Sequence, residues 1–320
     1  MNEINLSTMW SKGNYEDMED FVRDAYRWGF AGIELTSALS KESFDEILKV
    51  KGLKISSIHS PCSPISLSEK ASPDNPPLSS LDKEERERAI SYAGSTIEFA
   101  SQIGVKAVVV HAGFVPFGLK VDFEEKARQL STVNLSFLKE KLYRLYNQHS
   151  VTSKEYRELK ERLEKERSLR AKPYFEAAKI SLDKLVNFAL KREVKLGVET
   201  RDSFHEIPQF EEMENILEEF KGGPIGYWHD VGHAEKTSRL GFTPHRDWLS
   251  QFKDKMIGIH LHDVIGLQDH YLPGKGNMNW DFLAECLPKG ITMVCEVGEW
   301  NNREKIDEVV PFLRKKGILA

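Results

Sequence analysis

The sequence has few cysteines and no long apolar run. Its three cysteines, Cys62, Cys286 and Cys295, are not spaced as a CxxC pair. We therefore expect neither a disulfide framework nor a thiolate zinc site, and a reducing compartment fits. No apolar run approaches the roughly 18 residues that a transmembrane helix needs, and the opening MNEINLSTMW lacks the pattern of a secretory signal. These absences predict a soluble, cytoplasmic protein without a membrane partner.

The chain also lacks an excess of positive charge and a nucleotide-binding loop. Its formal net charge is -5 at pH 7, whereas a protein that binds duplex DNA usually carries a basic face. The first predicted strand is followed by TMWSKGNY, and no glycine-rich loop of a known phosphate-binding spacing occurs. We therefore expect neither a nucleic-acid partner nor a nucleotide cofactor.

Eight short apolar runs alternate with segments of helical period along the 320 residues. Parallel strands that are buried on both faces have this composition. Eight such repeats predict a closed (β/α)₈ TIM barrel made by one domain of residues 1–320. A doubly wound open sheet is the alternative, but it more often has about five to seven strands. The predicted strands are 4–8, 32–36, 54–59, 107–111, 195–199, 225–230, 256–261 and 293–297, and helical segments include 15–28, 82–103, 208–220 and 303–315.

Residues 121–180 form a long insertion after the fourth predicted strand. The segment exceeds an ordinary connection and is rich in Leu, Lys, Glu and Arg. It predicts two long charged helices with a break near Ser150–Ser153. Because it follows a strand, it would project from the face where the strands end. It is either a solvated helical hairpin or a lid or dimerisation arm, so a homodimer is compatible with the sequence.

Polar side chains gather where the predicted strands end. In a TIM barrel these ends surround one cavity, so residues far apart in sequence become neighbours. A lone His or Glu at a strand end is more often structural, but each of the third to eighth strands ends in His, Glu or Asp. This pattern predicts a divalent metal ion such as Mn²⁺, Zn²⁺, Co²⁺ or Mg²⁺. The residues are His59, His111, Glu199, His229, Asp230, His233, His260, His262, His270 and Glu296.

The same motifs resemble the xylose isomerase-like TIM barrel superfamily. That superfamily holds the sugar phosphate isomerase/epimerase group, the ketose 3-epimerases, inosose dehydratase and endonuclease IV. The resemblance spans nearly the whole barrel, outside 121–180, and is specific to the superfamily rather than to one reaction. The matching motifs are SIHSP, VVVHAG, GVET, HDVGHAE, IGIHLHD, DHYLPGKGNMNW and CEVGEW.

The resemblance implies the metal ligands. Glu199, Asp230, His260 and Glu296 would bind the principal metal ion. His233 would lie beside it and contact the substrate or a further metal ion.

The resemblance also implies roles around this centre. His262 would support the site or contact substrate. His59 and His111 match positions that hold a second metal ion in the endonuclease branch and contact substrate in the sugar branch. Asp269 and His270 resemble a third-metal pair of the endonuclease branch, in which one residue separates the two. His270 also takes the place of an arginine that binds substrate hydroxyls in ketose epimerases.

Proton transfer on a small sugar, sugar phosphate or polyol ketone is the predicted reaction. A divalent cation can stabilise the enediolate that forms when a carbon next to a carbonyl loses a proton. Glu199 and Glu296 would act as base and acid in an isomerase or epimerase, and loss of a β-hydroxyl from the same intermediate would give an inosose dehydratase-like lyase. Trp10, Phe114, Arg201, His262 and Lys275 are the expected substrate contacts.

Hydrolysis of abasic DNA, as in endonuclease IV, is the alternative reaction. Nearly all of that enzyme's metal positions have a counterpart here. Against it, the seventh strand continues as HLHDVI where the endonuclease branch typically reads HLNDSK, and the net charge is negative although phosphate contacts require Lys and Arg. The 121–180 helices would also crowd the face on which a duplex must lie.

Overall fold

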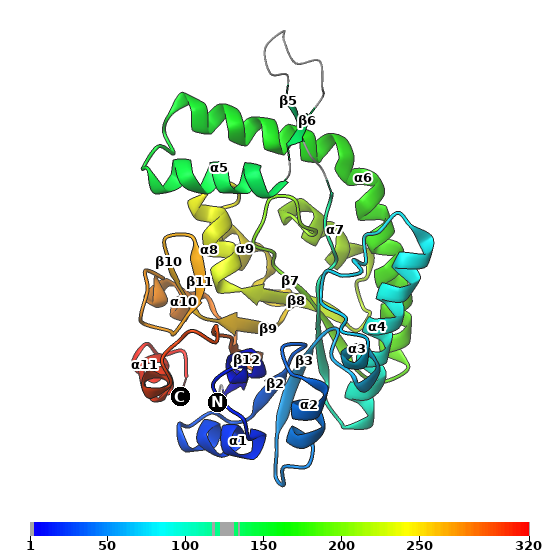
Figure 1. Cartoon of the computed structure of the whole chain (residues 1–320), viewed down its shortest axis with the longest axis vertical. Helices are drawn as coiled ribbons and strands as arrows, with labels where there is room; N and C mark the ends of the chain where they lie inside the picture. Colours follow the sequence, from blue (N-terminus) through cyan, green and yellow to red (C-terminus); the bar gives the residue numbers. More distant parts are fainter. Residues whose placement is uncertain (1–2, 117–118, 122–130, 134, 320) are drawn as a thin grey trace.

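A computed structural model describes residues 3–116, 119–121, 131–133 and 135–319. Its eight parallel barrel strands are β1 (Ile4–Ser7), β2 (Ile33–Leu35), β3 (Ile55–His59), β4 (Ala107–Val110), β7 (Lys195–Glu199), β8 (Ile225–Asp230), β9 (Met256–Leu261) and β12 (Thr292–Cys295). They close in the spatial order β1-β12-β9-β8-β7-β4-β3-β2 (Figure 1). Each strand begins within one residue of the run that predicts it. The predicted (β/α)₈ barrel is confirmed.

Helices surround the barrel, and two antiparallel hairpins extend its loops. The hairpins pair β5 (Leu119–Val121) with β6 (Ser131–Val133), and β10 (Asp263–Ile265) with β11 (Gln268–Tyr271). The α-helices are α1 (Met18–Arg27), α2 (Lys41–Ile47), α3 (Pro64–Ser68), α4 (Lys83–Gln102), α5 (Leu135–Asn147), α6 (Lys154–Leu190), α7 (Phe210–Glu219), α8 (Val231–Arg239), α9 (His245–Phe252), α10 (Trp280–Cys286) and α11 (Val309–Lys315). Three 3₁₀ helices are η1 (Thr8–Ser11), η2 (Lys253–Lys255) and η3 (Arg303–Glu308).

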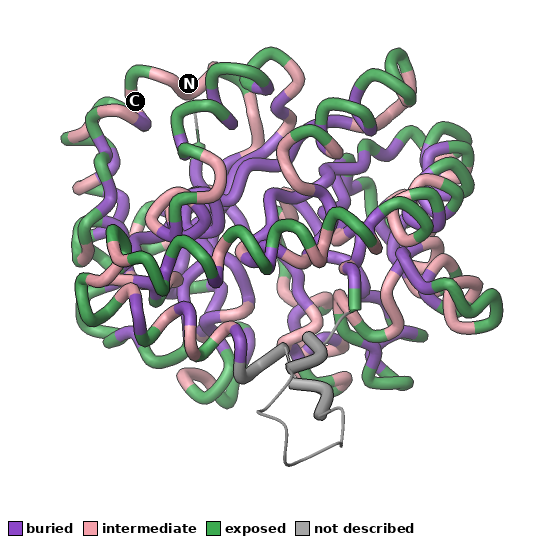
Figure 2. The backbone as a smooth tube through the Cα atoms, turned by 90° about the horizontal axis from the view of Figure 1, so that it is seen from above, coloured by how far each residue is buried: buried purple, intermediate pink, exposed green. Residues whose placement is uncertain are grey.

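The surrounding helices are amphipathic. Figure 2 shows the barrel strands almost entirely buried, while the helices alternate between buried and exposed positions. In α1, Phe21 and Val22 are buried, and Asp17 caps the helix by accepting two backbone N–H groups. The predicted helix 303–315 divides into η3 and α11, because Pro311 in the first turn of α11 lacks the N–H that an α-helix extending further back would need.

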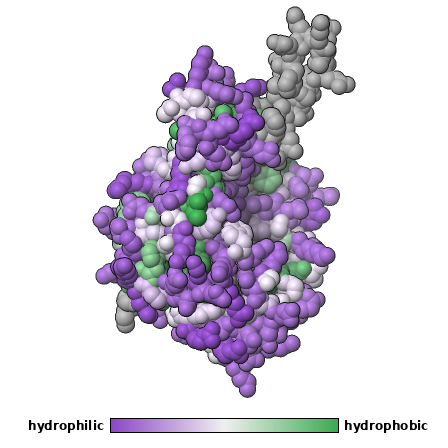
Figure 3. All heavy atoms as spheres, turned by 60° about the vertical axis from the view of Figure 1, so that its left-hand side comes forward, coloured by the Kyte–Doolittle hydropathy of each residue, from purple (hydrophilic) through white to green (hydrophobic). Residues whose placement is uncertain are grey.

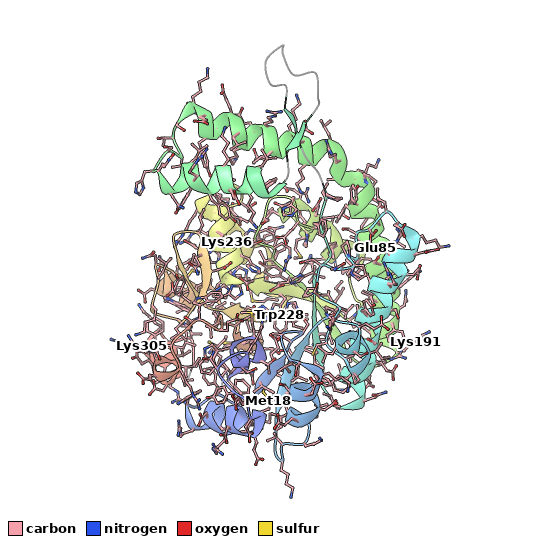
Figure 4. All side chains as sticks on the ribbon, in the orientation of Figure 1. Met18, Glu85, Lys191, Trp228, Lys236 and Lys305 are labelled. Carbon is pink, nitrogen blue, oxygen red and sulfur yellow. The ribbon has the colours of Figure 1, made fainter. Side chains whose placement is uncertain are left out.

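Trp228 fills the interior of the barrel beneath the strand ends. It has no exposed surface and lies near the centre of the barrel (Figure 4). Glycines on both neighbouring strands make room for it: a Cβ at Gly258 would lie 2.1 Å from the Trp228 ring, and one at Gly197 would lie 2.7 Å from it. The ring centroid lies 5.3 Å from that of His260. Trp228 therefore supports the strand ends from below. It packs with Ala107, Val109 and Val294.

The insertion after β4 contains two helices, as predicted. The break near Ser150–Ser153 is confirmed, since α5 ends at Asn147 and the Ser153 side chain caps α6 by accepting the N–H of Tyr156 at 3.1 Å. However, α6 continues to Leu190, ten residues beyond the predicted end, and the β5–β6 hairpin was not predicted. Residues 122–130 and 134 of the predicted insertion lie outside the described residues.

The outer surface is largely polar. In the view of Figure 3 the hydrophobic residues are scattered over a mostly hydrophilic face. Among the described residues, no helix combines the length and the apolar character that crossing a bilayer requires.

Candidate metal centre

Four neighbouring strands bring one acidic or imidazole side chain each to the same place. Glu199 ends β7, Asp230 ends β8, His260 lies in β9 and Glu296 follows β12. The Nδ1 atom of His260 lies 2.8 Å from Glu199 Oε1 and 3.1 Å from Glu296 Oε2. It lies 3.6 Å from Asp230 Oδ2. One ligand atom from each of the four residues lies within 4.8 Å of the others. Their role as ligands stays a prediction, but the convergence on which it depends is present.

The chemistry of this donor set fits a divalent metal ion. The four side chains belong to residues that are at most 5% exposed, and so much buried negative charge is costly without a cation. Carboxylate oxygens and an imidazole nitrogen suit Mn²⁺, Zn²⁺, Co²⁺ or Mg²⁺. Burial favours the uncharged acids, but the surrounding histidines hold the pKa values of Glu199 and Asp230 well below their ordinary range. Both carboxylates are therefore anionic.

A fifth acidic residue, Glu34 of β2, lies on the opposite side of the His260 ring. Its oxygens are 3.2 and 3.4 Å from His260 Nε2, and one of them accepts a hydrogen bond from Ser57 Oγ at 2.7 Å. Glu34 has no exposed surface. An N–H at Nε2 that donates to Glu34 leaves Nδ1 as the nitrogen available to a cation. Sequence reasoning missed Glu34, although an acidic residue within a short buried strand was a signal for it.

Asp230 is held by a helix end and a histidine. Its Oδ1 atom accepts the backbone N–H of His233 at 2.7 Å, as the N-cap of α8. His262 accepts the N–H of His270 at Nδ1, so it carries its proton on Nε2 and donates to Asp230 at 2.9 Å. His233 donates from Nδ1 to the carbonyl of Thr200 at 2.9 Å. Burial lowers the pKa of His233, so its Nε2 is available as an acceptor.

His59 and His111 approach the other oxygen of Glu199. The Nε2 atoms of His111 and His59 lie 2.7 Å and 3.4 Å from Glu199 Oε2. Asp74, in the loop before α4, lies 3.0 Å from His111 Nδ1. Burial and the charge of Arg201 oppose protonation of His111, but Asp74 and Glu199 together raise its pKa to about 9. His59, His111 and Glu199 form a second group, whose ligand atoms lie within 4.8 Å of one another.

His270 and Asp269 lie at the opposite side of the centre, on β11. His270 has φ 61°, a left-handed conformation that costs a non-glycine residue about 1 to 3 kcal/mol and is often found at functional sites. Its ring stacks on His262 with centroids 4.3 Å apart. Asp269 accepts a hydrogen bond from Lys236 of α8 at 2.8 Å, which occupies that carboxylate. A third donor group therefore consists of Asp230, His233 and His270, without Asp269.

Residues from all three groups line one cavity of about 310 Å³ at the strand ends, whereas Asp230 and His260 are not among its lining residues. Its volume lies at the lower end of the range of small-molecule sites, about 300 to 1,000 Å³. Met9, Ala38 and Pro73 are the apolar residues of its lining, and the other lining residues are polar or charged. The predicted site residues that line this cavity are His59, His111, Glu199, Arg201, His233, Asp269, His270 and Glu296.

Known proteins share features with this barrel. Residues 22–145 match the family described as xylose isomerase-like TIM barrel. The crystal structures of 3-keto-D-glucoside 4-epimerase from E. coli and of D-psicose 3-epimerase from Clostridium cellulolyticum H10 match with TM-scores of 0.65 and 0.60. The chain therefore resembles this family over residues 22–145 and shares the TIM-barrel fold of these enzymes over nearly its whole length. The sequence identities to the two structures are 14% and 11%, respectively. Each match covers 98% of this chain, and the matches cover 100% and 99% of the two structures. These structural matches establish the shared fold.

A curated relative matches a smaller part of the chain. The uncharacterized protein y4fM of Sinorhizobium fredii is 25% identical over 116 residues, which are 35% of this chain and 35% of that protein. The chain thus spans about a third of the length of this relative in the match.

Two aromatic residues of the barrel lie away from the cavity in which they were predicted. Trp10 has no exposed surface, and its indole N–H donates to the carbonyl of Asn301 at 3.3 Å, so it is part of the core. Phe114 pairs through its backbone with the Ser79 hydroxyl and does not line the cavity. The prediction that these rings contact substrate is not supported, because residues just after a strand can turn behind the wall of the cavity.

His262 and Lys275 also lie outside the cavity. His262 has no exposed surface and is occupied by its hydrogen bond to Asp230, so it supports the site rather than lining it. Lys275 forms an ion pair with Glu308 of η3 on the outer side. The motif around Lys275 instead uses its backbone: Gly274 N–H donates to Asp263 at 2.9 Å.

Several residues that line the cavity were missed by sequence reasoning. Met9 lies in η1 and the others lie in loops, and none of them ends a predicted strand in His, Glu or Asp. Asp202 carries the clearest signal, because it follows Glu199 and Arg201 directly. The missed lining residues are Met9, Thr36, Ser37, Ala38, Pro73 and Asp202.

Proposed function

We propose that this protein is a divalent-metal-dependent isomerase or epimerase that moves a proton on a small sugar or polyol ketone. The observation that carries the proposal is the convergence of Glu199 and Glu296, which line a cavity of small-molecule size, with the fully buried Asp230 and His260. Two carboxylates beside one binding point are the groups that a proton transfer next to a carbonyl requires. The relatives named as epimerases share this fold, and their activity supports the proposal without establishing it here.

Glu199, Asp230, His260 and Glu296 would hold the cation. When bound, such an ion polarises the substrate carbonyl and stabilises the negative charge of an enediolate. Glu199 and Glu296 lie at the ends of strands β7 and β12, which have β8 and β9 between them in the barrel. One carboxylate removes the proton from the carbon next to the carbonyl, and the other, in its acid form, returns a proton. Return to the opposite face inverts the carbon, and return to the neighbouring carbon gives an isomer.

His233 is placed to bind a substrate oxygen. Its Nδ1 is occupied by the carbonyl of Thr200, and the residue lines the cavity. A neutral Nε2 accepts a hydrogen bond from a substrate hydroxyl. This contact would fix which carbon lies between the two glutamates, and therefore which proton moves.

The helical insertion would act as a fixed wall of this site. Lys139 of α5 donates to Ser203 Oγ at 2.6 Å, in the loop that carries Arg201 and Asp202. Arg167 of α6 donates to the carbonyl of Glu206 at 3.0 Å in the same loop. Lys236 lies on α8, on the side of the barrel that α5 covers (Figure 4). A role of the insertion in dimerisation stays a prediction.

Exchange of a substrate proton with solvent tests the proposed function. The protein, loaded with MnCl₂ and incubated in D₂O with a panel of ketoses, inososes and their phosphates, is expected to introduce deuterium next to a carbonyl. Glu199→Gln and Glu296→Gln are expected to abolish exchange while the proteins stay folded. Glu161→Gln, an exposed carboxylate on α6, is the matched control and should keep it. A silent panel together with cleavage of an abasic oligonucleotide would reject the proposal in favour of DNA hydrolysis.

A further inference from the structure

Arg201 occupies the space between the donors of the second group. It lies two residues after Glu199, in the loop that follows β7, and is only 6% exposed. Its Nη1 atom lies 3.0 Å from Glu199 Oε2 and is in direct contact with His111 Nε2. Its Nη2 atom lies 2.7 Å from Glu206 Oε1 and 3.3 Å from Asp74 Oδ2. One buried guanidinium group thus touches three carboxylates and a histidine.

A metal ion in the second group would need the atoms that Arg201 already contacts. The two oxygens of Glu199 are divided: Oε1 faces His260 of the principal group, and Oε2 faces His111, His59 and Arg201. A second cation bridged by Glu199 would therefore have to share Oε2 with the guanidinium group. The ligand atoms of His59, His111 and Glu199 are close enough to one another to share a metal ion. That spacing does not consider the guanidinium group of Arg201, which contacts two of these three residues.

Arg201 cannot give up this place at low cost. A guanidinium group stays protonated in proteins, so its charge cannot be removed to admit a metal ion. Glu206 anchors the same group from the far side, and the Glu206 carboxylate is itself fixed by the N–H of Ser203 at 2.9 Å. Moving Arg201 would take the cation away from the buried Glu206 carboxylate, which is unfavourable.

We propose that Arg201 is a built-in cation that takes the place of a metal ion in the second group, so that no metal ion binds between His59, His111 and Glu199. The inference rests on the proposed function, because it presumes that the principal group of Glu199, Asp230, His260 and Glu296 binds a metal ion. It also bears on the reaction: a two-metal clamp on the attacking and leaving oxygens of a phosphodiester needs a second position. Arg201 blocks that position and favours proton transfer.

Metal stoichiometry tests this inference without an activity assay. Purified full-length protein, stripped with chelator, is titrated with MnCl₂ by equilibrium dialysis, and the electron paramagnetic resonance spectrum of the bound ion is recorded. The wild-type protein is expected to bind one equivalent, with the spectrum of an isolated ion. Arg201→Met, which removes the charge but keeps much of the side chain, is expected to bind two equivalents with an exchange-coupled spectrum. Arg201→Lys, the matched variant that keeps a cation, is expected to bind one.

Two further proteins keep the test decisive if Arg201→Met does not fold. The double variant R201M/E206Q removes the carboxylate that would be left unpaired, and it too should bind two equivalents. In a protein that keeps Arg201, the His111→Gln variant should still bind one equivalent of Mn²⁺, since His111 is not a ligand of the principal metal ion.

Each remaining outcome overturns the inference. Two equivalents in the wild-type protein, or one equivalent in a folded Arg201→Met protein, would contradict it while leaving the proposed function intact. No bound metal in the wild-type protein would reject the proposed function and the inference together.

Discussion

At the scale of single residues, the partner of His260 decides which of its nitrogens can bind a cation. Glu34 accepts from Nε2, so Nδ1 is directed at the three carboxylates. Carboxylates behind a ligating histidine orient the ring and raise its basicity, and their loss typically weakens metal binding about 10- to 100-fold. The sequence could not identify this pair, because Glu34 and His260 are 226 residues apart and meet only when the barrel closes. The strand-end residues were predictable because barrel geometry alone brings them together.

We predict that Glu34→Ala lowers the affinity for Mn²⁺ about 10- to 100-fold. Glu34→Gln should lower it less, because an amide oxygen still accepts from Nε2 but carries no charge. Isothermal titration with MnCl₂ measures both, and Glu161→Gln serves as the control. Unchanged affinity in a folded Glu34→Ala protein would show that His260 does not depend on this partner.

A second residue-scale prediction concerns the floor of the site. Gly258→Ala would place a methyl group 2.1 Å from the Trp228 ring, too close for the ring to remain where it is. We expect overpacking to destabilise the protein by about 1 to 3 kcal/mol. Gly197→Ala, with a closest approach of 2.7 Å, should also destabilise the protein but by less. Urea denaturation measures the free energy of unfolding of the wild-type protein and of both variants. Equal values for the three proteins would contradict the packing described for Trp228.

At the scale of elements, the loop after β7 depends on the insertion. It carries Arg201 and Asp202 into the cavity and is tied to α5 and α6. The two helices and the break near Ser150–Ser153 were predictable from composition. The contacts of Lys139 and Arg167 were not predictable. These helices carry charged residues on every face, so the sequence does not indicate which face packs against the barrel.

We predict that Arg167→Ala destabilises the protein by about 1 to 3 kcal/mol, since it removes hydrogen bonds to the Glu206 carbonyl and to Glu212 Oε2 at 2.7 Å. Lys165→Ala, an exposed position on the same helix, should change stability by less than about 0.5 kcal/mol. The free energy of unfolding in urea compares them. Equal effects of the two substitutions would mean that α6 is not anchored through Arg167.

At the scale of the whole molecule, closure of the barrel converts eight separate strand ends into one site. The eight repeats sufficed to predict this closure, and all eight strands begin where the runs indicate. The sequence did not distinguish residues that enter the cavity from residues that pass behind it, as Trp10 and Lys275 show. That distinction depends on the path of each loop, which is set by packing rather than by strand order.

Because the proposed ligands come from β7, β8, β9 and β12, a bound metal ion should stabilise the whole fold. A ligand that binds only the folded state at about 1,000 times its Kd adds about 4 kcal/mol. We therefore predict that MnCl₂ raises the Tm of the wild-type protein and leaves that of Glu296→Gln nearly unchanged. Differential scanning calorimetry measures both, and an equal rise in the two proteins would place the stabilising ion elsewhere.

The central claim is that four side chains from neighbouring strands hold one cation. Its most direct test is anomalous scattering from crystals grown with MnCl₂. We predict one strong anomalous peak within coordination distance of Glu199, Asp230, His260 and Glu296, and none between His59 and His111. Crystals that diffract well but show no peak at these four residues would contradict the claim.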